Sequence, residues 1–341
     1  MSGWQDMVKG NPVDWLLEPD IQNPAVRYLA LRDLQDSPAD SPEFIQAKAD
    51  AFSTGSVATI LSRMRPEGFW VKPGGGYGPK FTGSVWSLVT LAQMGADISH
   101  PGVRLAAEYM LGHTIAPAGW FSYNGTNPGL LHCHAGYLAA AMLDLGMTGD
   151  PKVMNAVEWQ ARLITGEDIA EVGDESPIRY YRYTPGPGFV CSANTGMPCA
   201  WGVVKAMGAL SRVNCLQRSR TIHEAIETGR QFLFGTNLKI CDFPTRDKSK
   251  DYRAWFKLGF PMLYSSDILE VLEVLTRLGD GADSRLQAIW QLVLDKQDAE
   301  GRWLMESAHD GKKWVTIEEK GQPGKWVTLR ALRALKAAFP S

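Results

Sequence analysis

The sequence has 341 residues, of which 45% are hydrophobic and 21% charged, and its formal net charge is -2 at pH 7. A chain of this length buries a large core in one or two domains, and its near-neutral charge argues against a nucleic-acid partner. The N-terminal stretch 1–17 carries Asp6, Lys9 and Asp14, so it lacks the unbroken apolar run of a signal peptide or membrane span. We therefore predict a cytoplasmic protein with no membrane span, and the composition leaves its oligomeric state open.

Cysteine and tryptophan are the most informative residue types in the composition. The five cysteines are an odd number in a chain with no recognisable export signal, which favours thiols or metal ligands over a disulfide framework. The twelve tryptophans suit a large core, and they also suit the wall of a cavity that holds an apolar or cationic ligand.

Apolar residues recur at helical spacing along the chain, and strand-like alternation is scarce. A recurring unit combines a Gly-rich turn with a very apolar helix, in the segments 26–34, 83–95, 136–146, 199–210, 264–279 and 326–337. More polar helices are expected between them, at 100–110, 151–165, 219–234 and 282–296. Gly- and Pro-rich loops are expected at 72–79, 116–129 and 184–198. About six repeats of this kind predict an inner and an outer ring of helices around a cavity, without a substantial β-sheet.

The segment from Gln297 to Trp303 carries the pattern Gln-x-x-x-Gly-x-Trp, and looser copies without the Gln occur at 68–70 and 119–121. The pattern resembles the repeat of squalene cyclases and prenyltransferases. The resemblance implies an all-α fold, an (α/α)6 barrel or toroid of helical hairpins, formed by residues 1–341 as a single domain. The runs 23–34, 202–210 and 325–332 resemble a prokaryotic branch of that superfamily from which no activity is carried over.

The acidic motifs of two terpenoid reactions are absent from the sequence. Squalene cyclases protonate an alkene with an Asp-x-Asp-Asp motif, and class I terpene synthases hold diphosphate through magnesium with Asp-Asp-x-x-Asp. Neither occurs here. Both reactions are therefore disfavoured.

The strongest candidate site is a set of cysteines and histidines. Cys133, between His132 and His134, and Cys199 stand at corresponding starts of adjacent inner helices, and Cys191 lies in the loop before Cys199. We predict that Cys133, Cys191 and Cys199 converge, with His132 or His134 as a further ligand, and that the ion is zinc, because thiolate and imidazole suit it. The alternatives are thiols that act as acid, base or nucleophile without a metal, and thiols that only pack.

The resemblance gives this site a precedent. Protein prenyltransferases and lanthionine synthetase C-like cyclases hold zinc at the mouth of the barrel, the latter with a Cys-His-Gly motif. This sequence has Ala200 after Cys199, so that histidine ligand is missing.

Two further candidates begin the inner helix at 264–279. Tyr264 and Asp267 are expected to face the same cavity as the cysteines, with Asp267 as a general acid or base. The alternative for Asp267 is a helix N-cap. The polar loop 309–324 is expected to cover the cavity.

These features predict an enzyme that acts on a small apolar or isoprenoid-like molecule in the cavity, through Cys-ligated zinc or a Cys/Asp acid–base pair. The expected classes are a lyase, a hydratase or isomerase, or an alkyl transferase. The alternatives are a zinc-dependent enzyme that modifies thiols or peptides, and a non-catalytic binding module.

Overall fold

The computed structural model describes residues 3–167, 185–245, 252–309 and 311–340, and helices dominate these ranges. The helices are α1 Pro12–Leu17, α2 Pro24–Asp33, α3 Pro42–Ser53, α4 Gly55–Ser62, α5 Ser84–Gln93, α6 Pro101–Thr114, α7 His132–Asp144, α8 Pro151–Thr165, α9 Ala200–Ser211, α10 Arg220–Phe234, α11 Ile268–Arg277, α12 Gln287–Leu294 and α13 Lys325–Ala338. The predicted all-α class is confirmed. Within the described ranges, none of these helices is both long and apolar enough to cross a bilayer.

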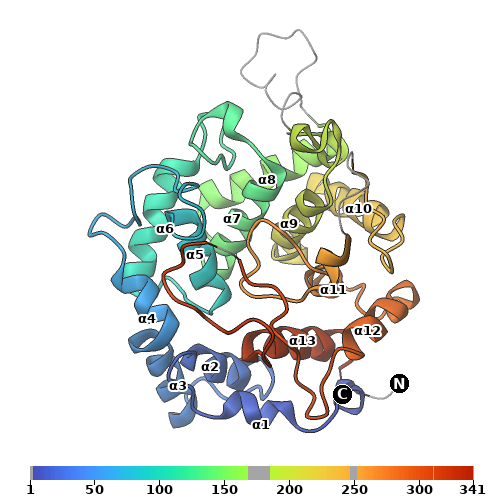
Figure 1. Ribbon diagram of the computed structural model, residues 1–341. Helices are drawn as coiled ribbons and strands as arrows, with labels where there is room; N and C mark the ends of the chain where they lie inside the picture. Colours follow the sequence, from blue (N-terminus) through green and yellow to red (C-terminus); the bar gives the residue numbers. More distant parts are fainter. Residues whose placement is uncertain (1–2, 168–184, 246–251, 310, 341) are drawn as a thin grey trace.

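The apolar helices contact one another in turn, as Figure 1 shows. Helix α7 packs against α5 and α9, α11 packs against α9 and α13, and α13 packs against α2. Gly95, which follows the end of α5, lies against Leu29 of α2, so α2 and α5 are neighbours as well. The more polar helices α3, α6, α8, α10 and α12 lie against α2, α5, α7, α9 and α11 respectively. The sequence did not single out α3 and α4, which follow α2.

Proline and glycine mark the ends of these helices. Proline is at the first turn of α2, α3, α6 and α8, where a missing N–H costs no hydrogen bond. Glycines in the left-handed region follow α5, α7 and α11, at Gly95, Gly146 and Gly279 with φ of 81°, 96° and 93°. Their N–H groups bond the last carbonyls of each helix, so these ends need no side-chain partner.

The described residues contain one small sheet, just before α9. Its strands β1 Pro185–Gly186, β2 Val190–Cys191 and β3 Met197–Pro198 pair antiparallel in chain order, with Val190 opposite Pro198. The Gly/Pro-rich loop predicted at 184–198 therefore folds back on itself and returns the chain to the start of α9; Thr184 lies outside the described residues.

The Gly-x-Trp pattern joins successive helices. Trp303 donates from Nε1 to the carbonyl of Val293 in α12 at 2.7 Å, and its own N–H donates to Thr328 Oγ1 in α13 at 3.0 Å. Trp70, in a looser copy, does the same with Ile60 of α4 at 2.8 Å and Ser84 Oγ of α5 at 2.9 Å. Each buried tryptophan thus links the end of one helix to the start of the next inner helix.

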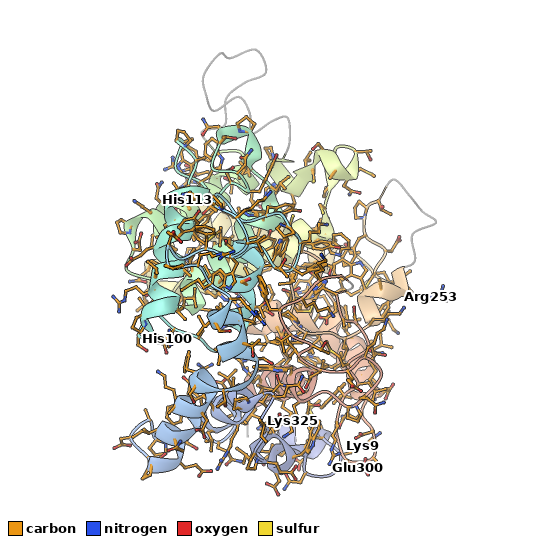
Figure 2. All side chains as sticks on the ribbon, turned by 60° about the vertical axis from the view of Figure 1, so that its left-hand side comes forward. Lys9, His100, His113, Arg253, Glu300 and Lys325 are labelled. Atoms are coloured by element: carbon orange, nitrogen blue, oxygen red, sulfur yellow. The ribbon has the colours of Figure 1, made fainter. Side chains whose placement is uncertain are left out.

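The glutamine of the same pattern connects the two ends of the chain. Gln297 accepts the N–H of Lys9 at 2.9 Å and donates to the carbonyl of Met7 at 3.2 Å. Figure 2 shows Lys9 beside Glu300. A side chain at Gly301, which has φ of 76°, would overlap the Lys9 carbonyl, so the turn requires glycine.

Candidate functional site

A large cavity lies between the six apolar helices and has a volume of about 870 Å³. Its apolar wall takes one or more residues from each helix, among them Leu29, Val89, Ala141, Gly208, Val274 and Leu329. Charged side chains share this wall. About half of the cavity wall is polar, so a cavity of this size suits a small molecule that has both an apolar and a polar part.

A buried ion pair stands in the cavity wall. Lys205 of α9 is 2% exposed, and its Nζ lies 2.6 Å and 2.8 Å from the two carboxylate oxygens of Glu270 in α11. Burial lowers the pKa of Lys205 and raises the pKa of Glu270, and each partner's charge opposes that shift. The neutral amine and the neutral acid are therefore closer in energy to the ion pair than they would be in water.

Asp267 is fully occupied by hydrogen bonds, which argues against its predicted role as a general acid or base. Oδ1 caps α11 by accepting the N–H of Glu270 at 2.7 Å, and it also accepts Arg330 Nη2 at 3.1 Å. Oδ2 accepts the N–H of Gly259 at 3.1 Å and Arg330 Nη1 at 3.0 Å. A carboxylate has about four lone-pair sites, so no site is left for a substrate proton. The alternative considered from the sequence, an N-cap, is confirmed.

Two buried polar side chains of α7 have no hydrogen-bond partner among the described residues. Tyr137 is 4% exposed and lines the cavity, and its hydroxyl is unpaired. His134 is fully buried with both ring nitrogens unpaired, and its ring lies 5.1 Å from that of Tyr137. Burial raises the pKa of Tyr137 well above its usual value and lowers the pKa of His134 to about 3. Buried polar groups are rarely left unpaired, so the Tyr137 hydroxyl is suited to a ligand in the cavity.

Tyr264 lies in an aromatic cluster at the end of the ring where the inner helices begin. Its ring lies 6.1 Å from Trp86 and 5.8 Å from Trp201, with the Nζ of Lys80 4.4 Å from its centroid. Tyr77 joins the cluster, and its pKa is raised by burial and then by the nearby Cys133 and Tyr264. Cys133 and Tyr264 therefore both lie near Tyr77. In the described structure neither residue, nor Asp267, lines the large cavity.

The thiols of Cys133, Cys191 and Cys199 lie near enough to affect one another's pKa values. Cys133 is the second residue of α7 and Cys199 is the N-cap of α9, and these two helices pack along their length. The Cys199 thiol donates a hydrogen bond to Cys191, which lowers the pKa of Cys191 and raises that of Cys199. Desolvation, followed by the charge on Cys191, raises the pKa of Cys133 to about 11. All five cysteines are free.

The described residues do not fit the predicted zinc ion. No three His, Cys, Asp or Glu side chains among them are grouped so as to hold a metal. Both ring nitrogens of His132 are hydrogen-bonded, Nε2 donating to the Gly186 carbonyl at 3.0 Å and Nδ1 accepting from Gln160 Nε2 at 2.9 Å, so neither is free for a metal in this arrangement. His132 instead joins α7, α8 and the small sheet. We derive no step through zinc.

The loop before α13 covers the end of the ring at which the inner helices begin (Figure 1). Trp314 donates to Ser87 Oγ in the first turn of α5 at 3.0 Å, and Glu318 accepts the N–H of Trp326 at the start of α13 at 3.0 Å. The mouth of the cavity lies at the other end, where the inner helices stop. Asp33, Asp144 and Arg277 line it.

Sequence reasoning missed Lys205, Glu270 and Arg330. A signal exists for Lys205, which is the one charged residue of α9. A charge at such a position is buried, and a buried charge needs a partner. Helices α11 and α13 each carry further charged residues, so no comparable signal marks Glu270 or Arg330.

Comparisons with known proteins provide no family assignment. No family model matches the chain, and no curated protein matches it. Among solved structures, a substituted type II terpene cyclase from Scytonema, in complex with the substrate geranylgeranyl dihydroxybenzoate, is 14% identical with a TM-score of 0.32. The match covers 83% of this chain and 95% of that chain. A similarity this low supports no correspondence between residues.

Proposed function

We propose that the chain is an (α/α)6-barrel enzyme that binds a small molecule with an apolar, isoprenoid-like body in its central cavity and transfers a proton within it. Lys205 and Glu270 are the acid–base pair. The reaction belongs to the lyase or isomerase class, because an acid–base pair moves a proton in both.

One observation carries this proposal, namely the ion pair of Lys205 and Glu270 in the wall of the 870 Å³ cavity. A buried ion pair is seldom favoured over apolar side chains for stability alone. Here it faces a space large enough for a ligand, and desolvation shifts both pKa values toward neutral pH.

Each residue of the site has a role that follows from its surroundings. Glu270, which is 16% exposed, is the more accessible partner and exchanges the proton with the ligand, while Lys205 holds its carboxylate at hydrogen-bond distance. The unpaired hydroxyl of Tyr137 donates a hydrogen bond to a polar atom of the ligand. The pairing of Arg330 with both Asp267 and Glu273 fixes the start of α11, on which Glu270 lies.

Proton transfer is testable without a known product. The protein is incubated in D2O with the isoprenoid ketone geranylacetone and with farnesol, and deuterium on carbon is measured by mass spectrometry. We expect incorporation by the wild type and a loss of roughly 10²–10⁴-fold in Glu270→Gln, since general acid–base groups contribute that much. Lys205→Met should show a loss as well, and Lys152→Met, an exposed lysine of α8, should match the wild type. Equal incorporation by Glu270→Gln would refute the acid–base role.

A non-catalytic carrier is the second candidate. The observation in its favour is that the charged groups of the wall pair with one another, as in Lys205 with Glu270 and Arg212 with Asp144. A carrier would bind the same probes in titration calorimetry and incorporate no deuterium.

A further inference from the structure

Three arginines from neighbouring helices meet at the mouth where the inner helices stop. Arg212 is the C-cap of α9, Arg277 is the last residue of α11, and Arg333 lies in α13. All three line the cavity, and all three act on the carboxylate of Asp144. The mouth therefore concentrates guanidinium groups on one side of the cavity.

The carboxylates at this mouth do not balance its cations. Arg32 and Lys336 bring the cations lining it to five, and Asp33, Asp36 and Asp144 pair with four of these. Asp97 also lines the wall, and Lys48 from outside the wall neutralises it at 2.9 Å. Glu273, which also lines the wall, pairs with Arg330 at 2.7 Å. Among the described residues, Arg277 is the cation at this mouth that has no ion-pair partner.

Arg277 is exposed and makes no ion pair or hydrogen bond with another described residue. The like charge of Arg212 lowers its pKa to about 10. A cation in the last turn of a helix is favourable by itself. The last carbonyls of α11, however, already accept N–H groups of Leu278, Gly279 and Asp280, so Arg277 is not needed as a cap.

We propose that Arg277, with Arg212 and Arg333, binds an oxyanion head group of the cavity's ligand, a carboxylate or a phosphate monoester. Guanidinium groups bind both through paired N–H donors. Apolar residues such as Leu29, Val274 and Ala334 line the same cavity, so the ligand is an anionic amphiphile with its tail inside the ring. This inference rests on the proposed function in one respect, that the cavity holds the apolar body.

Three probes with the same tail test the site: decan-1-ol, decanoate and decyl phosphate, titrated by calorimetry below their aggregation concentrations. We expect Arg277→Gln to weaken binding of at least one anion by roughly tenfold to a hundredfold, since hydrogen bonds to charged groups are strong. Decan-1-ol should bind the variant and the wild type equally. The anion that loses affinity identifies carboxylate or phosphate. Arg285→Gln is the matched control, because Arg285 pairs with Asp283 at the surface and does not line the cavity.

The outcomes separate the two proposals. Equal binding of both anions by wild type and Arg277→Gln overturns the oxyanion site, whatever decan-1-ol does. If decan-1-ol does not bind the wild type, the proposal that the cavity holds an apolar body is contradicted. The oxyanion site is then tested separately with inorganic phosphate. Phosphate should raise the melting temperature of the wild type more than that of Arg277→Gln, and an equal rise overturns the site. Without ligand, Arg277→Gln should melt no lower than the wild type, since the substitution removes like-charge repulsion.

Discussion

His132 and His134, which are separated by one residue, have opposite surroundings, and both stay neutral in the fold. His132 is satisfied by hydrogen bonds on both ring nitrogens, whereas His134 has none among the described residues. Burial lowers the pKa of His132 to about 4 and that of His134 to about 3, from an ordinary value of 6.5. The sequence pattern His-Cys-His suggested metal ligands, and it could not reveal that Gln160 and Gly186 occupy one imidazole.

These two pKa values predict a loss of stability in mild acid. Below pH 6.5 the unfolded chain binds protons that the folded chain rejects until about pH 4 and 3 respectively, so stability falls as pH falls through this window. Each histidine contributes at most about 1.4 kcal/mol per pH unit. The free energy of unfolding in urea, determined at pH 7, 6 and 5, measures this loss of stability. His134→Phe should remove about half of the histidine-dependent loss, and His223→Gln, exposed on α10, should remove none. An unchanged pH dependence in His134→Phe would show that this ring is not buried and neutral.

The charged pair of the cavity illustrates a limit of residue-scale prediction. Helical spacing identified the apolar residues of α9 and α11, but it could not predict which carboxylate would form an ion pair with Lys205. Lys205 and Glu270 are 65 positions apart and meet only because α9 and α11 are neighbours. Helix neighbours are a property of the assembled ring.

At the scale of elements, the contact of α7 with α9 sets the position of Lys205. Gly136 lies in the middle of α7, and a side chain there would overlap the backbone of Lys205 and Ala206. A Cβ atom added at Gly112 in α6 would have no other atom within 4 Å. Both are glycines inside helices, where alanine has the higher intrinsic propensity.

The same substitution should therefore have opposite effects at these two sites. Gly136→Ala should destabilise the protein by about 1–3 kcal/mol or more, because two backbones must separate. Gly112→Ala should stabilise it by up to about 1 kcal/mol. Free energies of unfolding in urea decide the matter, and a stabilising Gly136→Ala would mean that α7 and α9 are not in close contact.

The position of the apolar helices was predictable from the sequence, and their ends were partly so. Segments such as 136–146 and 326–337 coincide with α7 and α13 to within a few residues, because Gly-rich turns and apolar runs are local signals. The pair α3 and α4 was missed: α3 has a largely polar sequence, and α4 is apolar but has only eight residues, too few to show a clear helical period. The small sheet before α9 was also missed, since its two-residue strands carry no alternation.

For the whole molecule, closure of the ring depends on residues far apart in the chain. Gln297 binds Lys9 and Met7, and Trp326 of α13 donates from Nε1 to Asn23 beside α2 at 3.0 Å. The repeat pattern predicted successive apolar helices, and these contact one another in the structure. The charges of the cavity, and Arg277 with no ion-pair partner among the described residues, were beyond a pattern of apolar residues. The cavity is the product of this closure, since every inner helix contributes to its wall.

Calorimetric titration of farnesol tests most directly whether the cavity is the binding chamber. Ala140 of α7 lines the cavity, so Ala140→Leu places a larger side chain in it, while Ala49→Leu on the exposed face of α3 is the matched control. We predict that the wild type and Ala49→Leu bind farnesol alike and that Ala140→Leu binds it at least about tenfold more weakly, a loss of about 1.4 kcal/mol. Equal affinity in all three proteins, with Ala140→Leu folded, would contradict the account.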